Sequence, residues 1–211
     1  MKMKRTITTL CVLFCMALAH AQDVTKNLTM YQSYQPAMIH MTSGKSIKNL
    51  YTNIFLKNGA LLYLQGEKTM EARMETIAGV DFDDRKYINI DNQLAAALDT
   101  VGNNILYCIS LIDVDAYNQM LRNNVNITNL SFSDHMSYST IDLTAYEDQE
   151  LPVIYIFYYL YNGKLVRVHE REISRLLDKE KKRRYKTILS LPEFNWTDRE
   201  SLVNLLKAIT D

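Results

Sequence analysis

The first two-thirds of the chain consist of short apolar runs separated by turn residues. β-Branched and aromatic side chains fill the runs, and turn signals such as Thr42-Ser43-Gly44 and Asn58-Gly59 recur about every 8 to 12 residues. This spacing is typical of antiparallel hairpins, so we expect strands at residues 37–41, 47–56, 60–64, 69–74, 77–82, 86–90, 94–98, 105–112 and 138–143. The pattern predicts a small barrel or a sandwich of hairpins.

The hairpin signal is clearest near residue 160. Two apolar runs, at residues 153–161 and 164–169, flank Asn162-Gly163, a dipeptide that accommodates the positive φ angles of a type I′ turn. Because such a turn fixes the register of the two strands, we expect Tyr158 and Leu160 to be largely buried.

Apolar residues recur at helical spacing in three further segments. A short central helix is expected to follow Asp113, a good N-cap, and to end near residue 123. Beyond the hairpin the apolar period becomes about 3.6 residues, which predicts one helix at residues 173–190, ended by Pro192. A last helix is expected from Thr197, because Thr197 and Glu200 have the spacing of a capping box. The sequence therefore predicts an α+β fold with a β-rich antiparallel body, a short central helix and two C-terminal helices.

The first 21 residues have the order of parts that is typical of a cleavable secretory signal peptide. A positive start (Lys2, Lys4 and Arg5) precedes an apolar run at residues 9–18, and Ala19-His20-Ala21 offers the small-x-small pattern of a signal peptidase site. We therefore expect cleavage after the last of these alanines and export of the remaining chain.

The mature chain is expected to be a single globular unit at residues 22–211, with a β-rich body at 22–169 and a helical tail at 170–211 packed on it. Its predicted location is periplasmic, extracellular or surface-associated. A lipid anchor needs a cysteine directly after a small residue, whereas Cys15 follows Phe14, so we expect no lipoprotein. No later run combines the length and the lack of charge that a bilayer-spanning helix needs, so no transmembrane segment is expected in the mature chain.

Charge is unevenly distributed along the mature chain. Removal of the signal leaves 21 basic and 24 acidic side chains. Residues 22–163 hold 9 basic and 16 acidic groups, residues 164–186 hold 10 and 4, and residues 187–211 hold 2 and 4. One basic segment thus lies within an otherwise acidic protein.

Residue types that bind metals or activate substrates are sparse in the sequence. Cys108, the only thiol of the mature chain, lies in an apolar run that is typical of a buried strand, so we interpret it as structural. His40, His135 and His169 lack the spacing of a zinc site, and no phosphate-binding glycine loop is found. We therefore expect neither a cofactor nor a metal.

An aromatic strand is the first candidate interaction surface. Alternation along a strand places Tyr155, Phe157, Tyr159 and Tyr161 on one face. Aromatic rows of this kind bind sugars or partner proteins, but a central buried strand has the same pattern, and we favour the buried strand.

A basic helix is the second candidate interaction surface. Lys181, Lys182, Arg183 and Arg184 concentrate positive charge. A solvated helix surface is the simpler interpretation, because acids stand four residues before two of these cations. If the helix does bind a partner, we expect the association to be salt-sensitive and the replacement of all four cations by glutamine to leave thermal stability almost unchanged.

The motifs do not resemble those of a characterised family, and two functions stay open. The leading hypothesis is an exported, non-catalytic module that binds an unknown protein or polymer partner, with self-association as a further expectation. Nucleic acid is disfavoured as a partner, because export separates the protein from most of it. The rival is a secreted or periplasmic hydrolase with a carboxylate pair assembled in three dimensions from Asp81, Asp83, Asp84, Asp99 and Asp113.

Overall fold

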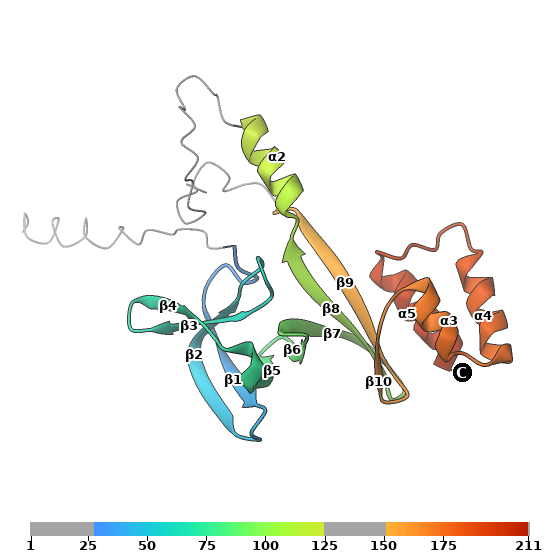
Figure 1. Cartoon of the computed structure of the whole chain (residues 1–211), viewed down its shortest axis with the longest axis horizontal. Coiled ribbons are helices and arrows are strands. Elements are labelled where there is room, and N and C mark those ends of the chain that lie inside the picture. Colours follow the sequence, from blue (N-terminus) through green and yellow to red (C-terminus); the bar gives the residue numbers. More distant parts are fainter. Residues whose placement is uncertain (1–27, 125–150, 211) are drawn as a thin grey trace, which may run out of the picture. The chain divides into compact units, whose positions relative to one another are not determined.

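The computed structural model of this 211-residue chain describes residues 28–124 and 151–210. These residues form one ten-stranded sheet in the order β10-β9-β8-β7-β6-β5-β1-β2-β3-β4, and each neighbouring pair is antiparallel (Figure 1). The strands are β1 (Gln35–Met41), β2 (Ser46–Ile54), β3 (Leu61–Gln65), β4 (Lys68–Glu71), β5 (Ile77–Phe82), β6 (Lys86–Ile90), β7 (Gln93–Val101), β8 (Asn104–Ile112), β9 (Val153–Tyr161) and β10 (Lys164–Arg167). The helices are α2 (Val114–Asn124), α3 (Glu170–Leu176), α4 (Lys179–Leu189) and α5 (Arg199–Thr210), and a short 3₁₀ helix spans Met74–Thr76. The predicted α+β, β-rich antiparallel class is confirmed.

The sheet is open, with β10 and β4 at its edges, in place of the closed barrel or stacked sandwich that the hairpin spacing predicts. It nevertheless curls, because the segment after β2 reaches back to β7 and β8. The backbone N–H of Ile112 donates to Leu56 O at 2.8 Å, and that of Leu94 donates to Gly59 O at 2.8 Å. Register shifts in β1 and β7 provide the bending, since a β-bulge bends its strand and increases the local twist.

The predicted β9–β10 hairpin is present, and Asn162 and Gly163 have φ angles of 49° and 75° at its turn. The expected burial of Tyr158 and Leu160 is wrong, because both are only half-buried. The opposite row of β9 is the buried one, since helices pack on that face of the sheet. Its buried members are Phe157, Tyr159 and Tyr161.

The central helix α2 follows Asp113 as predicted, and the Asp113 carboxylate accepts a hydrogen bond from Ala116 N at 3.0 Å. The single helix expected at residues 173–190 is divided into α3 and α4. Leu177 is extended and buried at the break, and the Asp178 side chain caps the new helix by accepting from the backbone N–H groups of residues 180 and 181. The C-terminal part therefore contains three helices where the sequence predicts two.

The last helix begins two residues later than expected. Its cap is Asp198 and not Thr197, because Ser201 N donates to the Asp198 carboxylate at 2.7 Å. Hydrogen bonds from Ser201 lower the pKa of Asp198, as expected for a carboxylate at a helix N-terminus. Thr197 instead donates to Asn195.

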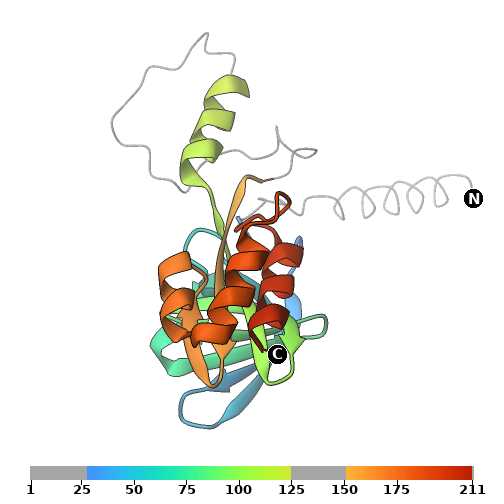
Figure 2. The ribbon, with the colours of Figure 1, turned by 90° about the vertical axis from the view of Figure 1, so that its right-hand side faces the viewer.

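The helices α3, α4 and α5 lie side by side, and α5 packs on β7 and β8 (Figure 2). One apolar cluster joins them to the sheet, a second lies inside the curl of β1, β3, β5 and β6, and a third, smaller cluster lies on β6, β7 and β8. The side chain of Leu98 packs against the first two clusters. These two clusters therefore meet at β7.

Two predictions fall outside the described residues: the signal peptide at residues 1–21 and the strand at residues 138–143. The described residues themselves belong to one compact unit. Among them, no helix is long and apolar enough to cross a membrane.

Candidate functional site

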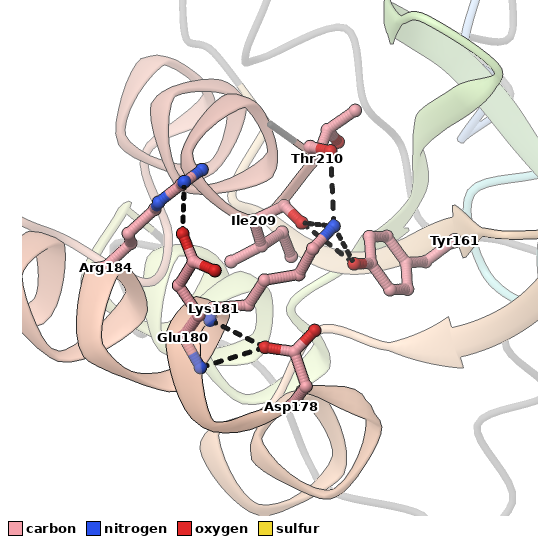
Figure 3. Close-up of polar contacts among 7 residues, drawn as sticks. All are labelled: Tyr161, Asp178, Glu180, Lys181, Arg184, Ile209 and Thr210. Carbon is pink, nitrogen blue, oxygen red and sulfur yellow. Dashed lines mark hydrogen bonds and ion pairs between the residues drawn. The ribbon is translucent and has the colours of Figure 1, made fainter.

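The four cations predicted as an interaction surface are among the six basic residues of α4, and of these four Lys181 is the one whose side chain contacts α5. Its Nζ donates to Ile209 O at 2.9 Å, to Thr210 O at 3.2 Å and to the hydroxyl of Tyr161 at 3.3 Å (Figure 3). The ammonium group also lies 5.8 Å from the centroid of the Tyr161 ring. Because the last carbonyls of a helix lack partners within the helix, Lys181 stabilises the C-terminus of α5.

The other three cations of the predicted group are exposed or make a local ion pair. Arg184 forms an ion pair with Glu180 at 2.9 Å, one turn earlier on the same helix (Figure 3). Lys182 and Arg183 are exposed, and neither side chain has a hydrogen bond or ion pair to another described residue. Two more exposed lysines of the same helix extend this outward basic face: Lys179 and Lys186.

The aromatic row of β9 is mostly covered by α5. The Tyr159 hydroxyl donates to Leu202 O at 2.6 Å and the Tyr161 hydroxyl donates to Ile209 O at 2.8 Å. Burial raises the pKa of Tyr159, so its hydroxyl stays protonated and available as a donor. Of this row only Tyr155 is exposed, with 55% of its surface accessible.

The five acids proposed for a carboxylate pair make separate contacts. Asp81 lies 3.3 Å from His40, and Asp84 accepts a hydrogen bond from a tyrosine hydroxyl at 2.9 Å. Asp99 pairs with a guanidinium at 3.2 Å, and Asp113 caps α2. Asp83 is exposed on the β5–β6 turn beside Asp84. None of these contacts joins one carboxylate to another.

Cys108 is buried and free, and burial raises the pKa of its thiol to about 11. At neutral pH it is therefore an uncharged thiol inside the core. Among the described residues, no group of three or more histidine, cysteine, aspartate or glutamate side chains is placed to hold a metal ion.

A Ser-His-Asp row on β2, β1 and β5 was missed by the sequence interpretation. The Nδ1 of His40 lies 2.9 Å from the Oγ of Ser46, and its Nε2 lies 3.3 Å from a carboxylate oxygen of Asp81. Hydrolytic triads contain the same residue types in the same order, although their serine commonly bonds to Nε2 of the histidine. Ser46 and His40 are direct partners across the β1–β2 hairpin, so the strand pattern indicates their contact. It does not indicate the contact with Asp81, because β5 belongs to a later part of the chain.

A groove of about 430 Å³ lies beside the β5–β6 turn. Phe82, Ala97 and Leu98 supply its apolar lining. Its charged lining comes from the turn and from the first residues of β6 and α5: Asp83, Asp84, Arg85, Lys86 and Arg199. The groove therefore combines an apolar floor with groups of both charges at its rim.

No protein-family model matches the chain, and neither a curated protein nor a solved structure is similar to it. Three features of the described residues have the chemistry of a functional site. They are the outward cations of α4, the row of Ser46, His40 and Asp81, and the groove beside the β5–β6 turn.

Proposed function

We propose that the protein is an exported, non-catalytic interaction module whose basic helix α4 binds an acidic partner. The observation that carries this proposal is the contrast between adjacent residues of α4. Lys181 is held by the C-terminus of α5, whereas Lys182 and Arg183 are exposed without ion pairs to described residues. Free cations on a stable helix attract anionic groups, because their charge is not neutralised locally.

The charge of the rest of the chain supports an acidic partner. The segment at residues 164–186 carries an excess of basic groups, and residues 22–163 carry an excess of acidic groups. The partner is therefore an acidic protein or polymer, or the acidic surface of a second copy. Attraction between exposed charges is screened as the Debye length falls from about 10 Å at 0.1 M salt to about 3 Å at 1 M.

Heparin, a sulfated polymer, serves as the anionic probe for this surface. We expect the mature chain to be retained on heparin at low salt and to elute well before about 1 M salt. The double substitution K182Q/R183Q is expected to shift elution to lower salt. The matched control K45Q/K48Q removes two exposed lysines from the β1–β2 hairpin, and we expect it to change elution much less.

Sedimentation of the same variants tests the second copy as the partner. A salt-sensitive dimer that K182Q/R183Q weakens supports self-association through α4. Retention on heparin or self-association that survives both about 1 M salt and the double substitution contradicts the proposal. Lys181 and Arg184 are left unchanged here, because their contacts confound a loss of binding with a loss of stability.

Export has a separate test. In a secreting host, the protein recovered outside the cytoplasm is expected to have the mass of residues 22–211, because the signal is removed after Ala21. An exported protein of full-length mass, or retention in the cytoplasm, contradicts this part of the proposal.

A second candidate function, hydrolysis, is favoured by the row of Ser46, His40 and Asp81. In this function, His40 takes the proton of the serine hydroxyl as its Oγ attacks a carbonyl or phosphoryl centre. A fluorophosphonate probe reports such a nucleophile, because Oγ displaces fluoride and remains covalently bound to phosphorus. Labelling that S46A and H40Q abolish and that S43A leaves intact supports a hydrolase, and the absence of labelling leaves the interaction module as the function.

A further inference from the structure

We propose that the groove beside the β5–β6 turn binds a small zwitterion with an apolar body, namely an amino acid or a short peptide with both ends free. In this site Asp84 receives the ammonium group, Arg199 receives the carboxylate, and the apolar part of the ligand lies on Phe82 and Leu98. This binding site is independent of the basic face of α4.

Arg199 is oriented for a carboxylate by contacts behind it. Its Nη2 donates to Leu98 O at 2.6 Å and to the Asp99 carboxylate at 3.2 Å. Its Nε and Nη1 have no hydrogen-bond partner among the described residues. A guanidinium that is fixed on one side and free on the other presents its planar N–H groups to a carboxylate with little loss of side-chain freedom.

Asp84 is oriented for a cation in the same way. Its Oδ1 accepts a hydrogen bond from the Tyr31 hydroxyl at 2.9 Å, and that hydroxyl lies 3.2 Å from the hydroxyl of Tyr87. Burial and the neighbouring Tyr87 raise the pKa of Tyr31, so the hydroxyl remains a neutral donor. The second oxygen of Asp84 accepts no hydrogen bond from a described residue and remains free for a ligand.

The floor of the groove is anchored by two of the apolar clusters. Phe82 is buried and contacts two tyrosines, with its ring centroid 4.8 Å from that of Tyr31 in a tilted arrangement and 5.6 Å from that of Tyr87 in an edge-to-face arrangement. Leu98 packs against the cluster under the helices and the cluster inside the curl. Binding pockets commonly combine an apolar lining with a few oriented polar groups at such a junction.

The pair of oriented charges selects the class of ligand. A ligand with a single charge uses either the free oxygen of Asp84 or the free N–H groups of Arg199 and leaves the other unused. A zwitterion satisfies both, and its apolar side chain covers the floor. The free ends of an amino acid or short peptide have this chemistry.

Isothermal titration of the full mature chain with L-leucine, dileucine and trileucine tests the proposal and selects the ligand length. We expect at least one of these three ligands to bind. Its N-acetylated form lacks the ammonium group and its C-terminal amide lacks the carboxylate, and each is expected to bind at least about tenfold more weakly, because each loses a charged hydrogen bond. If no free-ended ligand binds, or if the blocked forms bind as well as the free ones, the proposal is wrong.

Two variants test whether the ligand binds in this groove. D84N is expected to weaken the free-ended ligand by about tenfold or more and to leave the affinity for its N-acetylated form unchanged. The matched control D91N changes an exposed acid on the β6–β7 turn and is expected to leave both affinities unchanged. Equal effects of D84N and D91N contradict the assignment. Heparin retention of D84N is expected to equal that of the unchanged protein, so the groove and the basic face of α4 are tested separately.

Discussion

The strands β9 and β2 are both nine residues long, but they differ in composition and in covering. Every residue of β9 is apolar or aromatic and helices cover one face of the strand, whereas β2 is mostly polar and no helix covers it. In β9, the Tyr159 and Tyr161 hydroxyls reach backbone carbonyls of α5. In β2, Leu50 and Tyr51 are 57% and 56% exposed. Large apolar side chains are thus buried in β9 and exposed in the middle of β2, because burial depends on the element that packs against the strand.

The largest expected effect of this difference is on stability, when a buried leucine and an exposed leucine are each replaced by alanine. Leu206 of α5 is fully buried against the β9 side of the sheet, and Leu50 is exposed. L206A is expected to lower the free energy of unfolding by about 2 to 5 kcal/mol, because it removes buried methyl groups and leaves a cavity. L50A is expected to change it by no more than about 0.5 kcal/mol. Urea unfolding of both variants checks this contrast, and equal losses contradict it.

The next effect concerns adjacent lysines of α4. K181Q removes the ammonium group that holds the last carbonyls of α5 and is expected to cost about 1 to 2 kcal/mol, since a charged hydrogen bond contributes about 1.5 to 3 kcal/mol before its partial exposure is considered. K182Q is expected to be neutral within about 0.5 kcal/mol. Thermal and urea unfolding of the two variants measure the difference. The sequence predicts that replacing all four cations by glutamine leaves thermal stability almost unchanged. Because Lys181 contacts α5, we expect a measurable loss of stability instead.

A smaller effect is expected for a single buried hydroxyl. Y159F removes the donor to Leu202 O, and we expect it to lower the free energy of unfolding by about 0.5 to 1.5 kcal/mol. The control Y51F changes an exposed tyrosine of β2 and is expected to have no measurable effect. If the two substitutions are equivalent in urea unfolding, the contact with α5 contributes nothing to stability.

Buried tyrosines also predict a loss of stability at alkaline pH. Burial, together with the nearby charge of Glu170, raises the pKa of Tyr185 to about 12. In the unfolded chain this hydroxyl loses its proton near pH 10, so its contribution to stability is complete below about pH 10 and is lost as the pH rises towards 12. Y185F is expected to give a shallower decline of unfolding free energy over this range. Y51F should retain the steeper decline of the unchanged protein.

The local elements were largely predictable because turn residues mark their ends. The bounds of β5, β6 and β9 agree with the predicted runs, and Asp83-Asp84 and Asn162-Gly163 are the turns beside them. The break before α4 was not predicted. Leu177 continues an apolar stripe at helical spacing, and Asp178 is equally suited to a helix surface and to an N-cap.

The functional surfaces were less predictable because they depend on distant contacts. The sequence places four cations on one helix, but the distinction between Lys181 and Lys182 is made by the end of α5, which packs on only one side of α4. The groove requires Arg199 to reach β7, about a hundred residues earlier in the chain. Periodicity and local charge contain no information on such contacts.

The smallest effect that we expect lies on the surface of α4 itself. Glu180 and Arg184 form an i, i+4 ion pair in which both side chains are substantially exposed. Exposed helix pairs contribute only about 0.3 to 0.5 kcal/mol, because water screens the attraction and the side chains lose freedom. E180Q is therefore expected to reduce the free energy of unfolding by no more than about this amount, and the reduction should disappear near 1 M salt. A salt-independent loss as large as that of K181Q would show that Arg184 also belongs to the contact between α4 and α5, leaving Lys182 and Arg183 as the free cations of the predicted group.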